Sequence, residues 1–287
     1  MIVPTFARGP SPPPDGAPRN ISAGPPRIGQ PGLFLRDKIG RARHAAPMFR
    51  LDQEDGCATL VLDRPEARHA IPAAGWTALA EHIGAAEAGG ARLLVVTGAG
   101  GTFCAGADLA DFAAMRGDPA AVARFRAAMR GALDRLRGLA IPTVALIEGH
   151  CYGAGVALAM ACDLRVAALT AEFAITPAKI GISYPQEDLH RLVLLVGPGQ
   201  AARMLFGGQA ISGEEARRIG LVEANRPAET KLIEAILAND SESLAALKQA
   251  IARAADGVRS DADADRRFDA LIAGEELARR LEALRRK

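Results

Sequence analysis

The chain has 287 residues, of which 49% are hydrophobic and 24% are charged, a composition typical of globular proteins rather than of disordered or fibrous ones. Its 35 basic and 33 acidic residues leave a net charge of +2, so it lacks the strong positive charge with which nucleic-acid-binding proteins meet phosphates. No uninterrupted apolar run reaches the roughly 18 residues of a membrane-spanning helix. We therefore expect a cytoplasmic protein with neither nucleic acid nor membrane as a partner.

Residues 1–47 differ in composition from the rest of the chain. They contain ten of the 18 prolines, seven basic residues and two acidic residues. A stretch of this kind, without apolar periodicity, buries too little surface to offset the entropy lost on ordering. We expect a disordered extension, and two alternatives stay open: an organelle-targeting peptide, or a natural start at Met48.

From residue 48 onward, short β-type runs alternate with helical patterns. Apolar runs that end at a glycine or proline turn predict strands. These runs are residues 57–63, 92–97, 143–148, 164–168 and 172–175. Apolar residues that repeat every three to four positions predict helices around residues 76–83, 122–136, 187–195, 200–206 and 214–219. The alternation predicts an α/β body.

The C-terminal part of the chain shows helical patterns only, after a short extended piece at residues 221–223. Several apolar residues there recur at helical spacing and are candidates for core or subunit-contact positions. They are Leu247, Ile251, Phe268, Leu271 and Ile272. We expect three regions: the extension at 1–47, an α/β core at 48–225 and a helical region at 226–287.

Two glycine-rich segments, residues 97–109 and 148–160, each lead from a predicted strand into a helix. A turn of small residues before a helix N-terminus directs unpaired backbone N–H groups toward an anion. Two such turns that face each other would form an oxyanion hole from main-chain donors alone. The alternative is that the glycines merely permit tight turns and close packing. Neither turn has the spacing of a phosphate loop or of a dinucleotide site.

Six segments carry a resemblance to a known family. They are RPEARHA at 64–70, FCAGADL at 103–109, IPTVALIEG at 141–149, GAGVALAMACD at 153–163, EFAITPAKIG at 172–181 and ISGEEARRIGLV at 211–222. In order and spacing they resemble the crotonase superfamily, the enoyl-CoA hydratases and isomerases. The resemblance implies an α/β spiral of ββα units with C-terminal helices, and a homotrimer or a dimer of trimers. It also implies an acyl-CoA substrate, which carries its own coenzyme A, so no separate cofactor or metal is expected.

In that family, two backbone N–H groups hold the thioester oxygen, and the matching residues are Ala107 and Ala154. Ala154 stands where the family usually has glycine, so its methyl would crowd the thioester if its φ were unfavourable. The resemblance also places the nucleotide of coenzyme A along two further segments. The binding residues implied there are Arg64, Ala67, Arg68, Ala105, Gly106, Ala107 and Asp108. The two arginines are candidates for the phosphates, and an ordinary solvated position is the alternative for either.

The two glutamates that hydratases of this family use as acid and base are absent. The matching positions are Ala157 and Ala178. Since such groups contribute about a hundred- to ten-thousand-fold each, we do not expect efficient hydration by the usual route. Isomerase- or decarboxylase-type chemistry on a thioester enolate is favoured. The alternatives are a nominal or weak enoyl-CoA hydratase and a non-catalytic acyl-CoA-binding protein.

Tyr184, Glu187 and Asp188 are the candidates to replace the missing groups, because their segment lines the acyl pocket in the family. A tyrosine at the matching place occurs in methylmalonyl-CoA decarboxylases, although that branch has histidine where this chain has Ala107. One carboxylate would suffice to move a proton between two carbons in an isomerase. The alternative is that Pro185 and the two acids simply begin a helix and that Tyr184 packs in the pocket.

Overall fold

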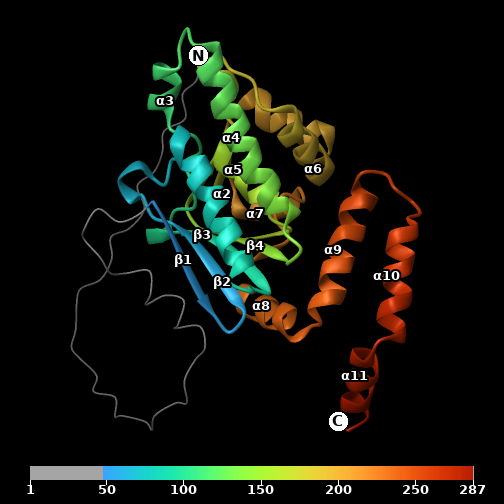
Figure 1. Ribbon diagram of the computed structural model, residues 1–287. Helices are drawn as coiled ribbons and strands as arrows, with labels where there is room; N and C mark the ends of the chain where they lie inside the picture. The colour runs from blue at the N-terminus through green and yellow to red at the C-terminus, as the bar shows by residue number, and fades with distance from the viewer. Residues whose placement is uncertain (1–47, 287) are drawn as a thin grey trace, which may run out of the picture.

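Two β-sheets organise residues 48–286, the part of the chain that the computed structural model describes (Figure 1). The expectations for residues 1–47, whether an extension, a targeting peptide or a start at Met48, concern residues outside this range. The strands are β1 (Phe49–Glu54), β2 (Cys57–Leu62), β3 (Leu93–Gly98), β4 (Thr143–Ile147), β5 (His150–Tyr152), β6 (Leu164–Ala167), β7 (Glu172–Ala174), β8 (Ile211–Ser212) and β9 (Ala224–Asn225). The α-helices are α2 (Ala73–Ala88), α3 (Leu109–Ala114), α4 (Pro119–Gly138), α5 (Ala154–Ala161), α6 (Gln186–Gly207), α7 (Gly213–Arg218), α8 (Glu229–Ala238), α9 (Ser241–Ala255), α10 (Ala262–Ala273) and α11 (Glu275–Arg285), and short 3-10 turns lie at η1 (Pro65–Ala67), η2 (Ala99–Gly101) and η3 (Pro177–Ile180).

The larger sheet has the strand order β1-β2-β3-β4-β6-β9. β1 pairs with β2 in antiparallel fashion, and all the other neighbours in this sheet are parallel. Parallel strands that are covered on both faces have nearly continuous apolar sequences. The sequences LLVV in β3 and TVALI in β4 are of this kind, and both are buried. The predicted alternation of strand and helix is confirmed.

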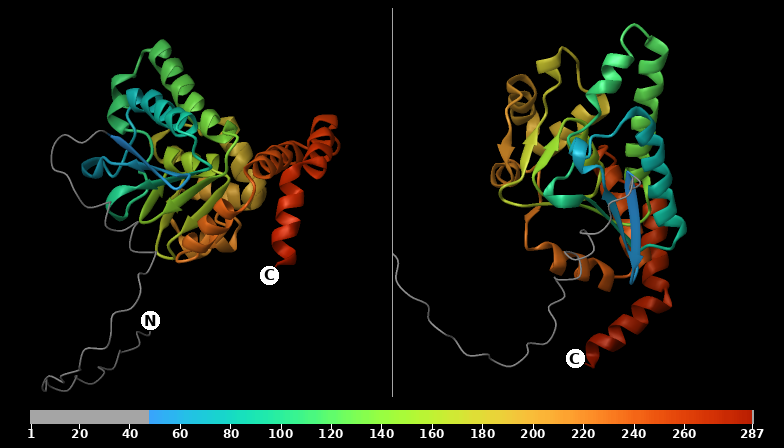
Figure 2. Two further views of the ribbon diagram at one scale, coloured as in Figure 1. Left: turned by 60° about the horizontal axis from the view of Figure 1, so that its bottom comes forward. Right: turned by 90° about the vertical axis from the view of Figure 1, so that its left-hand side faces the viewer.

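Side chains alternate between the two faces of the larger sheet. On β3, Leu94 and Val96 join one hydrophobic cluster, while Leu93 and Val95 join another on the opposite face. Helices α2 and α4 cover the first face, and α8 covers the second through Ile236 (Figures 1 and 2). The apolar core therefore lies on both sides of the sheet.

Helix α5 lies at the centre of this arrangement, because every residue from 155 to 161 is buried. A helix that is apolar on all sides is stable only when it is covered all round. The smaller sheet, β5-β7-β8, contributes Cys151, Phe173 and Ile211 to the same cluster as α5. The N-terminus of α5 is thereby fixed against both sheets.

Helices α9, α10 and α11 extend from one side of the body (Figures 1 and 2). Lys248 on α9 holds the group in place, because its Nζ lies 2.8 Å from both the Asp163 carboxylate and the Ile141 carbonyl oxygen. Large apolar side chains on these helices are exposed. They are Leu247, Ile251, Phe268, Ile272, Leu277, Leu281 and Leu284. None of the described helices is long and apolar enough to cross a membrane.

Some elements differ from the sequence prediction. β1 was not predicted, because the edge strand FRLDQE is mostly polar and its second half is exposed. β5 was also missed, since it is only three residues long and lies within a segment predicted as a turn. The strand expected at residues 221–223 forms slightly later, as β9. The separation expected between the helices at residues 187–195 and 200–206 is confirmed by a break at Gly197, which has φ of 75° and ψ of 162° within α6.

Replacement of Phe173 by alanine should lower the free energy of unfolding by about 3 to 5 kcal/mol, because a fully buried ring is lost from the core. The matched control is Phe206→Ala on α6, where the side chain is 84% exposed, and a change within about 0.5 kcal/mol is expected. Urea unfolding followed by circular dichroism measures both. Similar losses in the two variants would contradict this description of the core.

Candidate active site

Backbone hydrogen bonds join two glycine-containing bends, which we call the first glycine bend (residues 98–108) and the second glycine bend (residues 148–155). The Cys104 amide donates to the His150 carbonyl oxygen at 2.9 Å, and the Tyr152 amide donates to the Cys104 carbonyl oxygen at 2.9 Å. Cys104 and Cys151 thus form an isolated parallel β-bridge. The two bends that the sequence singled out lie side by side.

Gly106 brings the first glycine bend close to the start of α5. Its φ is +97°, and a Cβ built there would lie 2.7 Å from the Tyr152 carbonyl oxygen and 3.0 Å from the Ala154 amide nitrogen. A side chain at this position would be both strained and in collision with backbone. Only glycine therefore permits the approach of residues 106 and 107 to Ala154.

The amides of Ala107 and Ala154 have no acceptor among residues 48–286. The amides of the adjacent residues do have acceptors. The Asp108 amide donates to the Ile71 carbonyl at 3.0 Å, and the Gly153 amide donates to the Ala174 carbonyl at 2.8 Å. Ala154 is the first residue of α5 and has no left-handed φ, so its methyl group adopts an ordinary helical position. Two adjacent bends thus each offer an unused main-chain donor beside a helix N-terminus.

A third segment, the arginine bend (residues 64–71), lies against the first glycine bend. The Ile71 amide donates to the Gly106 carbonyl at 2.8 Å, and the Ala105 amide donates to the Arg68 carbonyl at 2.9 Å. The Arg64 guanidinium donates to the Asp108 carboxylate at 2.7 Å and to the Ala70 carbonyl at 3.0 Å. The structure therefore brings together the residues that the resemblance implied for nucleotide binding.

Asp108 connects the arginine bend to helix α3. Its carboxylate accepts from Arg64 and also caps α3 by accepting from the Ala110 amide at 3.1 Å. The hydrogen bond from Arg64, followed by that from Ala110, lowers the pKa of Asp108 below its ordinary value. The carboxylate is therefore charged at neutral pH, and the Arg64 guanidinium is already paired.

Arg68 differs from Arg64 in exposure and in partners. It is exposed, and its backbone is in the left-handed region with φ of 49°. Its guanidinium makes no hydrogen bond or ion pair with another residue in the described range. Ala67 precedes it in the 3-10 turn η1 and is half-buried. Of the two arginines on this bend, Arg68 has the guanidinium that is available to a ligand.

His69 is a residue whose role the sequence did not reveal. Its ring is buried, with Nδ1 accepting from the Arg64 amide at 2.9 Å and Nε2 placed 2.8 Å from the Ala99 carbonyl oxygen. These partners require the proton on Nε2, and burial lowers the pKa of the imidazole. A neutral His69 therefore ties the arginine bend to the first glycine bend.

Tyr184 contacts the second glycine bend. Its hydroxyl donates to the Gly153 carbonyl oxygen at 3.0 Å, and its ring packs against the main core cluster. Burial, and then the charge of Asp188, raise the pKa of the phenol well above its ordinary value. The hydroxyl is therefore a stable hydrogen-bond donor at neutral pH.

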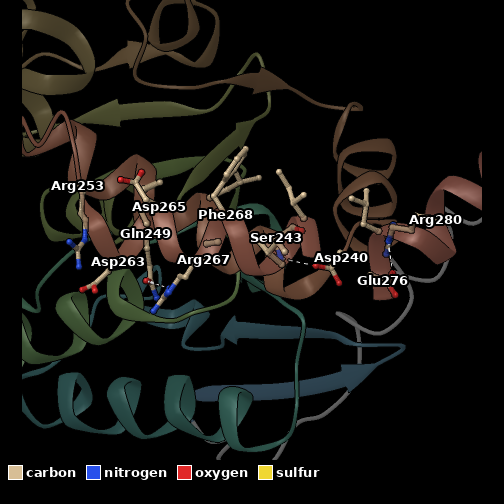
Figure 3. A pocket seen from close by; sticks show the side chains of 17 residues that line it. Asp240, Ser243, Gln249, Arg253, Asp263, Asp265, Arg267, Phe268, Glu276 and Arg280 are labelled. Carbon is tan, nitrogen blue, oxygen red and sulfur yellow. Dashed lines mark hydrogen bonds and ion pairs between the residues drawn. The ribbon is translucent and has the colours of Figure 1, made fainter. Parts of the chain in front are cut away.

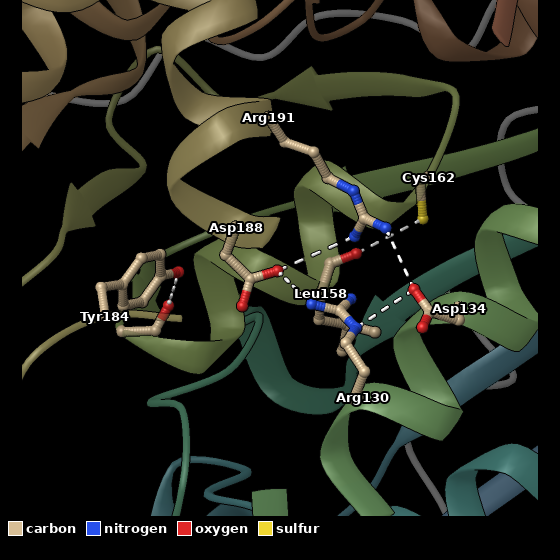
Figure 4. A network of polar contacts seen from close by, with 8 residues as sticks. Arg130, Asp134, Leu158, Cys162, Tyr184, Asp188 and Arg191 are labelled. Carbon is tan, nitrogen blue, oxygen red and sulfur yellow. Dashed lines mark hydrogen bonds and ion pairs between the residues drawn. The ribbon is translucent and has the colours of Figure 1, made fainter. Parts of the chain in front are cut away.

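Glu187 and Asp188 occupy the first turn of α6, with Pro185 immediately before it, as the helix-start alternative predicted. Glu187 is exposed, whereas Asp188 is fully buried with its Oδ1 3.0 Å from Nη1 of Arg130 (Figure 4). Burial raises the pKa of Asp188, although the bond from Arg130 acts in the opposite direction. The two acids therefore lie in different environments: Glu187 is exposed to solvent, and Asp188 is buried and paired with Arg130.

Arg130 and Asp188 belong to a network of two arginines and two aspartates on α4 and α6, in which Asp188 and Arg191 are buried and Asp134 is exposed (Figure 4). Asp134 lies 3.1 Å from Nε of Arg130 and 3.3 Å from Nη2 of Arg191, and Arg191 approaches Asp188 at 3.8 Å. The buried carboxylate of Asp188 thus has two arginines beside it, as a buried charge requires. The spacing of Arg130 with Asp134, four residues apart on one helix, was the available sequence signal.

The residues at the missing glutamate positions differ in environment. Ala157 lies on α5 and is 1% exposed, while Ala178 lies on η3 and is exposed. Neither methyl group can accept or deliver a proton.

No group of three or more histidine, cysteine, aspartate or glutamate side chains in residues 48–286 is arranged to hold a metal ion. Burial raises the pKa of Cys104 to about 12, so this thiol is not ionised at neutral pH.

A separate groove of about 570 Å³ lies between α9, α10 and α11 (Figure 3). Leu247, Phe268 and Leu271 form part of its apolar lining, and Arg253, Arg267 and other charged side chains surround it. None of the candidate site residues lines this groove. It is therefore distinct from the three bends.

Comparison with known proteins gives consistent results. A family model described as enoyl-CoA hydratase/isomerase matches residues 52–280. A Mycobacterium tuberculosis protein named "Probable enoyl-CoA hydratase echA6" is 36% identical over 179 residues, which span 62% of this chain and 70% of the relative. The crotonyl-CoA hydratase of Syntrophomonas wolfei is 33% identical over 222 residues, spanning 74% of this chain and 83% of the relative.

Solved structures share the fold. An enoyl-CoA hydratase/isomerase family protein from Hyphomonas neptunium superimposes with a TM-score of 0.77 at 33% identity, covering 83% of this chain and 94% of that one. An enoyl-CoA hydratase/carnithine racemase from Magnetospirillum magneticum gives a TM-score of 0.78 at 27% identity, covering 84% and 93%. The predicted crotonase-like α/β fold is confirmed.

Gly106→Ala should destabilise the protein more than Gly100→Ala, although both glycines have a positive φ. A left-handed alanine costs about 1 to 2 kcal/mol at either position. The Cβ at 100 meets no atom within 4 Å, whereas the Cβ at 106 meets backbone and adds about 1 to 3 kcal/mol of strain. Urea unfolding of both variants measures the difference, and equal stabilities would contradict the close approach of the two glycine bends.

Proposed function

The chain belongs to the enoyl-CoA hydratase/isomerase family, and from this we propose that it is an acyl-CoA-processing enzyme that stabilises a thioester enolate. The observation that supports the proposal is the pair of unused amides, those of Ala107 and Ala154, on two bends held side by side. We propose that both donate into the same site, where the thioester oxygen accepts from each. Fixed donors of this kind act on charge that develops during reaction, and removal of one typically costs about a hundred- to a thousand-fold in rate.

The absence of acid and base side chains at positions 157 and 178 supports chemistry other than efficient hydration. Hydration needs one group to take a proton from water and another to deliver a proton to the α-carbon. Decarboxylation of a malonyl-type thioester needs no protein base, because the breaking C–C bond releases carbon dioxide and leaves its electron pair in the enolate. A proton from water then completes the product at the α-carbon.

The positions of the acids favour decarboxylation over double-bond isomerisation. An isomerase needs a base that removes a proton from one carbon and returns it to another. Asp188 is held by Arg130, and Glu187 points from an exposed helix start. Neither is set up as that base in the described structure, whereas the two amides alone suffice to stabilise the enolate that decarboxylation produces.

Coenzyme A is proposed to lie along the arginine bend and residues 105–108. The guanidinium of Arg68 makes no hydrogen bond or ion pair with any described residue, and phosphate groups bind such side chains through charge-assisted hydrogen bonds. Arg64 is proposed to shape this segment through its bond to Asp108 rather than to meet the phosphates alone. Ala67 and Ala105 are half-buried and are proposed to line the same surface, and the buried Gly106 is proposed to shape it.

We further propose that the protein is a trimer or a dimer of trimers and that it acts in the cytoplasm. The exposed apolar side chains of α9–α11 offer a surface for a second copy, since a patch of this kind typically marks an association site. All four cysteines are free thiols, as is usual in reducing compartments.

A panel of CoA thioesters tests the proposed function. Purified protein is incubated with malonyl-type, enoyl and dienoyl thioesters, products are identified by mass spectrometry, and binding is measured by calorimetry. Conversion of a malonyl-type thioester with release of carbon dioxide is the expected outcome. Binding without any conversion would contradict an enzymatic role and favour an acyl-CoA-binding protein, and absence of binding would contradict the whole proposal.

The double substitution Ala157→Glu with Ala178→Glu should raise hydration of crotonyl-CoA at least tenfold, since acid and base groups contribute about a hundred-fold or more each. The matched control is Ala157→Gln with Ala178→Gln, which has the same size but transfers no proton. Because position 157 is buried, the melting temperatures of both variants are compared first. If both variants fold and hydrate equally, the assignment of these two positions is wrong.

A further inference from the structure

The bond from Tyr184 reaches the peptide group that carries one of the proposed oxyanion donors. Its hydroxyl donates to the Gly153 carbonyl oxygen at 3.0 Å across 31 residues of sequence. The Gly153 carbonyl and the Ala154 N–H are the two ends of one peptide group. Tyr184 therefore acts on the same planar unit that offers the Ala154 amide to the site.

The geometry of that peptide places Tyr184 and the site on opposite sides. In a trans peptide the C=O and the N–H point in opposite directions, and Arg226-Pro227 is the only cis peptide in residues 48–286. The hydroxyl fixes the carbonyl at one end, so the N–H at the other end is directed away from the tyrosine. Gly153 has φ of 51° and ψ of −119°, an orientation that glycine reaches without an energetic penalty but that must still be held in place.

Three donors converge on the Gly153 carbonyl oxygen. Besides Tyr184, the amides of Val156 and Ala157 approach it at 2.9 and 3.3 Å as the first helical bonds of α5. A hydrogen bond accepted by the C=O of a peptide group and one donated by its N–H form a chain, and bonds in such a chain strengthen one another by roughly 10 to 30% per bond. Each donor to the carbonyl draws electron density from the peptide nitrogen and makes the Ala154 N–H a stronger donor.

Tyr184 is suited to this role because its hydroxyl keeps its proton. Burial and the nearby charge of Asp188 raise the pKa of the phenol, and the Asp188 carboxylate is itself held by Arg130. The titratable and charged groups that face the hydroxyl from the packed elements are Asp188, Cys151 and Arg130. The donor is therefore constant across neutral pH.

We propose that Tyr184 is a positioning residue for the oxyanion hole, orienting and polarising the Gly153–Ala154 peptide, rather than a group that exchanges protons with the substrate. This inference rests on the proposed function, because it requires that the Ala154 amide binds a thioester oxygen. It gives Tyr184 a role that its hydrogen bond to Gly153 already fulfils without a ligand.

The test compares Tyr184→Phe with Tyr152→Phe. Tyrosine occurs only twice in the chain, and the Tyr152 hydroxyl bonds instead to the Glu172 carboxylate at 2.5 Å, so the control also removes one bonded hydroxyl. The probe is malonyl-CoA or crotonyl-CoA labelled with 13C at the thioester carbonyl. Infrared spectroscopy measures how far the carbonyl stretching frequency falls when the thioester binds, which reports the strength of hydrogen bonding to its oxygen.

The wild-type protein and Tyr152→Phe should lower the carbonyl frequency by the same amount, and Tyr184→Phe should lower it clearly less. Turnover should fall about three- to tenfold in Tyr184→Phe, as expected for one hydrogen bond, with KM changed by less than about twofold. A wild-type shift in Tyr184→Phe would overturn the inference while leaving the proposed function in place. Absence of any shift in the wild-type protein would instead overturn the proposed function.

A second measurement avoids dependence on the stability of Tyr184→Phe. When 3-fluorotyrosine is incorporated throughout the Tyr152→Phe protein, Tyr184 is the only tyrosine labelled. Fluorine makes the phenol a stronger hydrogen-bond donor without removing it. The carbonyl frequency of the bound thioester should then fall further than in unlabelled Tyr152→Phe, and an unchanged frequency would contradict the role of the hydroxyl.

Discussion

The paired backbone hydrogen bonds between Cys104 and the strand β5 are the interaction on which the rest of the site depends. They place two bends that are more than forty residues apart in sequence, near Gly106 and near Ala154, against each other. The neighbouring amides are used in holding the bends, and those of Ala107 and Ala154 have no acceptor within the part of the chain that the structure describes. A donor pair made of backbone places no side chain against the oxygen that it binds. Its strength depends on the rigidity of the buried helix α5 and the strands around it and, by the inference above, on the hydroxyl of Tyr184.

The charged groups near this pair are used for structure in the described chain. Arg64 is bonded to Asp108, and Asp188 is bonded to Arg130, so these two carboxylates are fixed in ion pairs. This arrangement accounts for the direction of the proposed chemistry. If the two amides act as the proposed oxyanion donors, such a site favours reactions in which a bond to carbon dioxide, rather than to a proton, supplies the electrons of the enolate.

Much of this arrangement could be predicted from the sequence, because local signals determine it. The glycine bends, the helix start at Pro185 and the break at Gly197 each follow from residues adjacent in the chain. The bonds that complete the site could not be predicted in this way. His69 bonds to the carbonyl of Ala99, 30 residues away, and Tyr184 bonds to the carbonyl of Gly153, 31 residues away. The periodicity of a sequence does not indicate which distant carbonyl a side chain contacts. The roles proposed for Ala107 and Ala154 follow from the family resemblance, and only the three-dimensional structure shows that their amides have no acceptor among the described residues.

The central claim is that both main-chain amides bind one thioester oxygen. A crystal structure with an unreactive CoA thioester bound tests it most directly. The account predicts that the amide nitrogens of Ala107 and Ala154 both lie about 2.7 to 3.1 Å from the thioester carbonyl oxygen. A bound thioester whose oxygen lies beyond hydrogen-bond distance of either nitrogen would contradict it.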